Sequence, residues 1–236
     1  MSNIKATLKD HMGSDLTVVN AARVSFGKES YAVAWLDYDY EDKSRCGDLI
    51  AVLEPRDQKL IRYLAKHKHL SPFGHAFASF HVKAPIFVAR QLVKHKFLRW
   101  NEISRRYVAD APEFFRGETW RRSAENVKQG SGDAFSPDED VTFYIQDEYE
   151  ELVSMALECY TRMLRRGVAP EQARMVLPQS TMTEWYWSGS LDAFAAMCNL
   201  RCASDTQYES RVVADQISKV LGDLFPVAWE ALRENA

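Results

Sequence analysis

The sequence lacks the compositional features of the specialised protein classes. Its 236 residues include only four cysteines, ten glycines and eight prolines, and apolar residues make up 46% of the chain. This composition excludes collagen-like, disordered and disulfide-rich proteins and is typical of a globular protein with a sizeable core. The net charge is only −3, so the molecule as a whole does not attract polyanions. Any affinity for phosphate must therefore come from a local basic cluster.

Signals for secretion, membrane insertion and metal binding are also missing. The cysteines form no CxxC pair, and the N-terminus lacks the apolar stretch and cleavage site of a signal peptide. No apolar run approaches the roughly 18 residues that span a bilayer. We therefore expect a cytoplasmic protein that has no membrane partner. His67, His69, His75 and His81 do not have the spacing of a zinc site, so no metal is predicted.

Helical patterns dominate the chain. Apolar residues recur at spacings of three and four from Ser136 to Gly167, which predicts a long amphipathic helix. Capping residues and prolines delimit further helices at 14–26, 57–71, 85–93, 170–177, 190–200 and 204–225, and 76–84 has the residue types of a strand. Because helices follow one another instead of alternating with strands, we expect an α+β fold in a single domain over 1–236. Within it, 27–54, which has some strand character, and 110–135 are expected to be surface excursions.

The segment 94–107, KHKFLRWNEISRRY, holds most of the candidate binding chemistry. Six basic or titratable side chains surround Glu102 and Ser104 there. Two arginines and a hydroxyl close together suit a phosphate, because guanidinium and O–H groups give charge-assisted hydrogen bonds to its oxygens. Three aromatic residues interleave with the basic ones, which is also the pattern of a stacking platform for single-stranded nucleic acid. A solvated basic loop is the third interpretation.

This segment resembles the signature of the flavin-dependent thymidylate synthases, in which Arg-His-Arg is followed by seven residues and a serine. Here it is Lys94-His95-Lys96, seven residues and Ser104, with Asn-Glu before the serine and Arg-Tyr after it in register. Other blocks follow the family order: AARVSF at 21–26, KHKHLSPFGH at 66–75, FHVKAPIFVARQ at 80–91, ARMVLP at 173–178 and NLR at 199–201. The resemblance covers much of the chain but not 27–54 or 110–135.

The resemblance implies a helix-rich α+β fold with a small antiparallel sheet, and a homotetramer whose active sites lie between subunits. It also implies an enzyme that converts dUMP to dTMP, with methylenetetrahydrofolate as the one-carbon donor and NADPH-reduced FAD as the source of hydride. No cysteine of such an enzyme attacks the pyrimidine, which agrees with the lack of an activated cysteine in this sequence. The expected partners are thus small-molecule substrates and further copies of the chain, and not nucleic acid.

The resemblance also assigns roles to individual residues. Arg201 is expected to lie against the pyrimidine and to stabilise the anion formed when N3 ionises, which makes C5 nucleophilic. The residues expected to bind the nucleotide are Gln91, Lys94, Glu102, Ser104, Arg106, Arg174 and Arg201, of which Ser104, Arg106 and Arg174 hold the phosphate. The residues expected at the flavin are Ser25, His69, Ser71, Lys94, His95, Lys96, Asn101, Glu102 and Ser190.

The chain departs from the family pattern mainly at the flavin site. Lys94 and Lys96 replace two arginines, which keeps the charge but removes the planar guanidinium fork. Asp192 stands where family members often have an arginine, and Ala196 where they have an asparagine. These changes predict altered flavin binding. They also leave open an alternative reaction, in which a pyrimidine nucleotide is hydroxymethylated because water and not hydride completes the one-carbon transfer.

Overall fold

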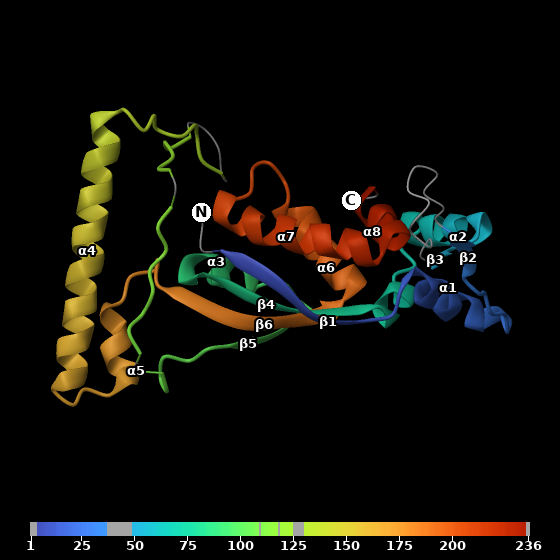
Figure 1. Cartoon of the computed structure of the whole chain (residues 1–236), viewed down its shortest axis with the longest axis horizontal. Helices are drawn as coiled ribbons and strands as arrows, with labels where there is room; N and C mark the ends of the chain where they lie inside the picture. Colours follow the sequence, from blue (N-terminus) through green and yellow to red (C-terminus); the bar gives the residue numbers. More distant parts are fainter. Residues whose placement is uncertain (1–3, 37–48, 109, 118, 125–129, 235–236) are drawn as a thin grey trace, which may run out of the picture.

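The computed structural model describes residues 4–36, 49–108, 110–117, 119–124 and 130–234. Its centre is a four-stranded antiparallel sheet with the strand order β1-β4-β6-β5 (Figure 1). These strands are β1 (Lys5–Met12), β4 (Phe77–Pro85), β5 (Arg99–Glu102) and β6 (Met182–Ser190). A second, two-stranded sheet pairs β2 (Val33–Leu36) with β3 (Leu49–Val52).

Alternation along the strands gives the main sheet one buried and one open face. In β4, Phe80 and Val82 are fully buried, whereas His81 and Lys83 remain partly exposed. Successive side chains of a strand point to opposite faces, so this pattern places the large apolar residues on one face and polar residues on the other. Phe80 is paired with Trp187 of β6, which continues the buried layer across the sheet.

Helices cover one face of the sheet and lie at one of its ends (Figure 1). They are α1 (Asp15–Arg23), α2 (Pro55–Lys66), α3 (Ile86–Leu92), α6 (Leu191–Arg201), α7 (Tyr208–Leu224) and α8 (Pro226–Glu234). Figure 1 shows α3, α6 and α7 along one side of the sheet, and α1, α2 and α8 near one end. Short 3-10 helices connect these elements: η1 (Val24–Phe26), η2 (Ser71–His75) and η3 (Arg174–Val176).

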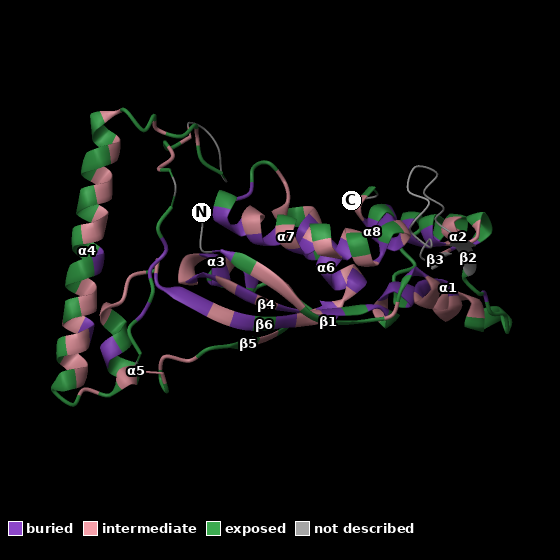
Figure 2. Cartoon of the chain, in the orientation of Figure 1, coloured by how far each residue is buried: buried purple, intermediate pink, exposed green. Residues whose placement is uncertain are grey.

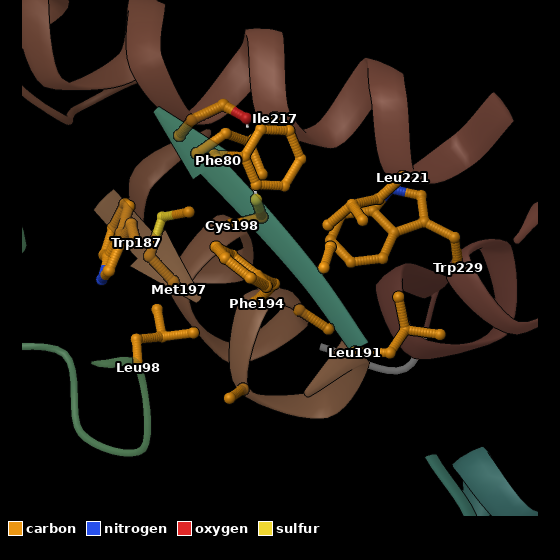
Figure 3. Packing of buried hydrophobic residues seen from close by; sticks show 14 of the residues in the cluster. Phe80, Leu98, Trp187, Leu191, Phe194, Met197, Cys198, Ile217, Leu221 and Trp229 are labelled. Atoms are coloured by element: carbon orange, nitrogen blue, oxygen red, sulfur yellow. Dashed lines mark hydrogen bonds between the residues drawn. The ribbon is translucent and has the colours of Figure 1, made fainter. Parts of the chain in front are cut away.

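The hydrophobic core lies between the sheet and the helices α6, α7 and α8 (Figure 3). Phe194 of α6 is fully buried and contacts Phe80 and Trp187 edge-on, with ring centroids 5.4 and 5.8 Å apart. Burying a side chain of this size stabilises the fold by about 2–3 kcal/mol. Ile217 of α7 belongs to the same cluster. The core therefore fixes α6, whose last residue is Arg201, against the sheet.

A buried carboxylate joins the first helix to the last. The two oxygens of Asp15 accept the backbone N–H groups of Val227 and Ala228, at 2.9 Å each. Burial raises the pKa of Asp15, and these two hydrogen bonds act in the opposite direction. Because the first N–H groups of a helix have no partner within it, this carboxylate stabilises the start of α8 against α1.

Helix α4 (Asp140–Arg165) and the short α5 (Pro170–Ala173) stand away from the sheet at one end of the molecule (Figure 1). Only Val153 and Tyr160 of α4 are buried, and most of the helix is exposed or half-exposed (Figure 2). Among the described residues, no helix is both long and apolar enough to cross a membrane.

The α+β fold with a small antiparallel sheet is confirmed, and the helix predicted from Ser136 is α4. The helix predicted at 170–177 is wrong in length, because α5 is followed by a single 3-10 turn, and α7 begins at Tyr208, not directly after Ser204. The sequence pattern does not reveal β1, β5, β6 or α8. Within the 27–54 segment, β2 and β3 confirm the strand character, and 37–48 lies outside the described residues.

Candidate functional site

Arg201 and His95 meet although 106 positions separate them in the sequence. Arg201 Nε donates to His95 Nε2 at 3.0 Å, which joins the end of α6 to the turn after α3. Burial, and then the positive charge of Arg201, lowers the pKa of His95 to about 4. The imidazole is therefore neutral at pH 7, and because Nε2 accepts a hydrogen bond, its proton lies on Nδ1. Burial also lowers the pKa of Arg201.

A cavity of about 600 Å³ lies beside Arg201. Its walls come from α3 and the turn after it, the end of α6, the residue before α7, and positions 121 and 130–131. The lining residues are Gln91, Lys94, Arg121, Gly130, Ser131, Arg201 and Gln207. Three of them are cationic, and Arg121 is ion-paired with Glu209 at 2.6 Å. The cavity wall therefore carries an excess of positive charge and favours an anionic ligand.

Glu102 is held at the end of the edge strand β5. Its Oε1 accepts from Thr183 Oγ1 at 2.7 Å, and its Oε2 accepts from Trp100 Nε1 at 3.1 Å. Trp100 is stacked on Trp185 of β6, with ring centroids 4.3 Å apart and planes at 19°. Both carboxylate oxygens of Glu102 are therefore oriented by the sheet, although the residue itself is exposed.

The turn that leads into β5 packs closely on β6 at a glycine. A Cβ atom on Gly189 would lie 2.4 Å from Leu98 Cδ2 and 3.2 Å from the carbonyl oxygen of Phe97. Phe97 itself has a positive φ of 68° and is 84% exposed. A φ in this region is uncommon for a residue with a side chain, so the packing on both sides must hold it. The turn that carries His95 therefore depends on the absence of a side chain at Gly189.

The three residues expected on the phosphate lie outside the cavity. Ser104 and Arg106 follow β5, and Ser104 Oγ accepts from the Arg106 backbone N–H at 3.3 Å and from its Nε at 3.4 Å. Arg174 is exposed on η3 and donates to the carbonyl oxygen of Glu171 at 3.2 Å. None of these three is among the described residues that line the cavity. One copy of the chain therefore brings Gln91 and Lys94 to Arg201, but not the expected phosphate ligands.

The residues expected at the flavin fall into two groups. One group lies in or beside η1, η2 and the start of α6: Ser25, His69, Ser71 and Ser190. η2 packs against α6 and against α1, the helix that η1 directly follows. The other group lies in the turn before β5 or on that strand: Lys94, His95, Lys96, Asn101 and Glu102. All nine residues are exposed or half-buried.

Arg121, Ser131 and Gln207 line the cavity but are not among the residues that sequence reasoning selects. The first two belong to the expected excursion at 110–135, which folds back on itself through the Arg121–Ala134 bridge. Arg121 Nε also donates to Ser131 Oγ at 2.8 Å. This segment therefore does more than cover the surface. The only signal for it in the sequence is the pair of arginines at 121 and 122 within a polar segment.

The two thiols near Arg201 lie outside the cavity lining. Cys198 is fully buried, and burial raises its pKa. A hydrogen bond from Cys198 lowers the pKa of the half-buried Cys202, which directly follows Arg201. Within the described residues, no group of three or more histidine, cysteine, aspartate or glutamate side chains is placed to hold a metal ion.

Comparison with known families shows a match over most of the chain. The family described as "Thymidylate synthase complementing protein" matches residues 7–227. Two proteins named flavin-dependent thymidylate synthase are each 37% identical to the chain. The alignment with the protein of Thermus thermophilus spans 228 residues, 97% of this chain and 75% of that protein. The alignment with the protein of Kosmotoga olearia spans 224 residues, 95% of this chain and 87% of that protein.

Solved structures agree with the sequence match. The UMP/dUMP methylase PolB from Streptomyces cacaoi, bound with 5-Br UMP, superposes with a TM-score of 0.80 at 29% identity. That comparison covers 100% of this chain and 96% of the other. The same methylase bound with 5-Br dUMP gives a TM-score of 0.77 at 30% identity, and covers 99% of this chain and 96% of the other.

Proposed function

Because the chain belongs to the family of flavin-dependent thymidylate synthases, we propose that it converts dUMP into dTMP, with methylenetetrahydrofolate as one-carbon donor and NADPH as reductant of bound FAD. The observation that carries this proposal is the cationic cavity at Arg201, whose guanidinium is oriented by a neutral His95. We place the activity in the cytoplasm, where the free thiols of Cys159, Cys198 and Cys202 stay reduced.

Arg201 supplies the electrostatic part of the reaction. Its Nε is held by His95 at 3.0 Å, so the two terminal nitrogens form the fork that faces N3 and the adjacent carbonyl oxygen of the pyrimidine. A positive charge there stabilises the anion formed when N3 loses its proton, and delocalisation of that charge makes C5 nucleophilic. A neutral His95 is essential to this arrangement, because a protonated ring would repel the guanidinium that it orients.

The residues expected at the flavin have chemistry that suits a flavin dinucleotide. Lys94 and Lys96 provide positive charge for a pyrophosphate group. His69 lies in a group of rings with Tyr63, at a centroid distance of 6.3 Å, and such exposed rings can stack on a heterocycle. Asp192 has a buried oxygen with no hydrogen-bond partner among the described residues, and a hydroxyl group of a bound cofactor would satisfy it. When bound, FAD supplies the hydride that reduces the transferred carbon.

A second copy of the chain completes the site in this proposal. Ser104, Arg106 and Arg174 lie outside the cavity that Arg201 lines, so the phosphate ligands for one nucleotide come from another subunit. Helix α4 offers apolar surface for such an assembly, since Phe143 and Tyr144 are each 65% exposed. These observations support the homotetramer that the family resemblance implies.

The reaction is tested by the mass of its product. The FAD-loaded protein is incubated with dUMP and methylenetetrahydrofolate under anaerobic conditions, with and without NADPH. We expect a methylated nucleotide that forms only when NADPH is present. A hydroxymethylated nucleotide that forms equally well without NADPH would transfer the assignment to the alternative reaction, and a protein that binds neither FAD nor dUMP would contradict the proposal.

The shared site is tested by mixing two inactive variants. If Arg106 and Arg201 of one site come from different subunits, Arg106→Ala and Arg201→Ala chains assembled in equal amounts form some sites in which both arginines are intact. Random assembly makes about one quarter of the sites complete, so about a quarter of the wild-type activity should return. A mixture that stays as inactive as its two components would place both arginines in the same subunit.

A further inference from the structure

A chain of hydrogen bonds runs from the segment 119–135 to Gln91. Arg121 Nη2 donates to Glu209 Oε1 at 2.6 Å, and Gln207 Nε2 donates to Glu209 Oε2 at 3.1 Å. Gln91 Nε2 donates to Gln207 Oε1, and Ser210 Oγ donates to Gln91 Oε1 at 3.1 Å. Glu209 and Ser210 are 7% and 0% exposed. These hydrogen bonds thus connect a buried carboxylate to three residues that line the cavity, Arg121, Gln207 and Gln91.

Glu209 determines the direction of every bond in this chain. An ionised carboxylate only accepts hydrogen bonds, so the amide nitrogen of Gln207 must face it. The amide oxygen of Gln207 then faces Gln91, and only the amide nitrogen of Gln91 can donate a hydrogen bond to it. The oxygen of Gln91 is consequently turned to the hydroxyl of Ser210. An amide group has a donor end and an acceptor end of nearly the same shape, so packing alone does not distinguish the two orientations.

We infer that Glu209 is a positioning residue, which fixes the amide orientation of Gln91 and thereby the pattern of donor and acceptor that the cavity presents to a nucleotide. One N–H and one lone pair of Gln91 remain for a ligand after its contacts to Gln207 and Ser210. This inference rests on the proposed function, since the ligand is taken to be dUMP. Glu209 contacts neither Gln91 nor the ligand in this scheme. It acts on Gln91 through Gln207, and it also holds Arg121 of the cavity wall by an ion pair.

Replacing one carboxylate oxygen of Glu209 by an amide nitrogen tests the direction of these hydrogen bonds. In Glu209→Gln, the new amide must face Arg121, which only donates, and Gln207 Nε2, which also donates. The amide oxygen at position 209 accepts from the charged Arg121, because hydrogen bonds to charged groups are stronger than those between neutral groups. The amide nitrogen at position 209 then faces Gln207, whose amide must turn over, and Gln91 must turn over in response. A donor that faced the ligand is thereby exchanged for an acceptor.

Exchanging the two side chains restores the original direction. In the double variant Glu209→Gln with Gln207→Glu, the oxygen at position 209 still accepts from Arg121, and its nitrogen donates to the new carboxylate at 207. That carboxylate accepts from Gln91 Nε2, as the Gln207 oxygen does now. Composition and net charge equal those of the wild type, but the carboxylate moves from the buried position 209 to the cavity wall at 207, where it opposes an anionic ligand. A recovery of binding would therefore report the direction of the hydrogen bonds, because the change in charge acts against it.

The experiment measures dUMP affinity of the FAD-loaded protein by calorimetry. We expect Glu209→Gln to weaken binding about tenfold, as for one hydrogen bond exchanged for an unfavourable contact, and the double variant to bind more tightly than Glu209→Gln. In a Gln91→Met background, Glu209→Gln should weaken binding less than it does in the wild type, because the part of its effect that passes through Gln91 is gone. The matched control is Glu150→Gln, because Glu150 accepts from Arg116 at 2.8 Å and from Gln146 Nε2 at 3.0 Å and does not line the cavity.

A second measurement reads the amide orientation without a ligand. In selectively labelled protein, the side-chain amide protons of Gln91 should show a stronger nuclear Overhauser effect to Ser210 in Glu209→Gln than in the wild type. Should that variant not fold, Gln207→Met cuts the same chain, and its loss of affinity should likewise be smaller in the Gln91→Met background. Wild-type affinity in Glu209→Gln, an unchanged Gln91 orientation in that variant, or failure of the exchange to restore the wild-type orientation would overturn the inference. Absence of dUMP binding in the wild type would instead overturn the proposed function.

Discussion

Replacing Arg201 by methionine should raise the pKa of His95 without restoring it to its ordinary value. Burial is the first cause of the lowering to about 4, and the charge of Arg201 is the second. A neighbouring like charge shifts a pKa by about 1–3 units, and because His95 is only half-buried we expect the low end of this range. The pKa of His95 should therefore rise to about 5 and stay below the 6.5 of an unperturbed histidine.

The titration can be followed by nuclear magnetic resonance of the imidazole C–H groups. The chain has six histidines, and the signal of His95 is assigned by its loss in His95→Asn. The matched control is Arg233→Met, because Arg233 donates to Asn199 of α6 at 2.5 Å and has no contact with His95. A His95 pKa that remains at about 4 in Arg201→Met, or that moves equally in Arg233→Met, would refute the electrostatic coupling of the pair.

Four further outcomes follow from the structure. Arg201→Ala should lower turnover about a hundredfold to a thousandfold in steady-state assays, since a preorganised donor to a developing anion is lost. The free energy of unfolding should fall as the pH drops from 6.5 to about 4. In this range His95 is protonated in the unfolded state but still neutral in the folded state. Solvent screening of a half-buried ring limits this loss to about 1–2 kcal/mol, and denaturant titrations of His95→Asn should show a flatter profile. Gly189→Ala should lower the free energy of unfolding by about 1–3 kcal/mol, because its Cβ would lie 2.4 Å from Leu98. An unchanged melting temperature would contradict this. Asp15→Ala should lower the free energy of unfolding by about 1–3 kcal/mol, since two buried N–H groups lose their acceptor. Asp15→Asn should lower it less, and denaturant titrations measure both.

The sequence by itself determines the helices with strong periodicity and the family to which the chain belongs. Helix α4 follows from apolar residues at spacings of three and four, because a 26-residue helix repeats that signal over many turns. Gln91, Lys94 and Arg201, which line the cavity, follow from the family resemblance, since each matching block lies within a few residues of a single element. Local signals of this kind survive in the sequence whatever the tertiary contacts are.

Strand β6 shows why parts of the fold are not evident in the sequence. Trp185 and Trp187 are buried, but Tyr186 between them is 48% exposed on the open face of the sheet. Three consecutive aromatic residues conceal the alternation that identifies a half-buried strand. Strand β5 is only four residues long, and it is a strand because β6 lies beside it. In both cases the hydrogen-bond partners of the strand lie on a neighbouring strand that is distant in the sequence, so no local pattern can predict them.

For the site too, the sequence identifies the residues, and the tertiary structure decides which of them are in contact. The motifs select His95 and Arg201 separately, but only the packing of α6 on the sheet brings Nε2 and Nε within 3.0 Å and lowers the histidine pKa. The contact of Arg121 with Glu209 joins residues 88 positions apart, and the only local sign of it is the pair of arginines at 121 and 122. Hydrogen bonds and desolvation depend on distances between atoms that the chain brings together only when it folds. The sequence therefore determined which chemical groups are present, and the tertiary structure decided which of them act on one another.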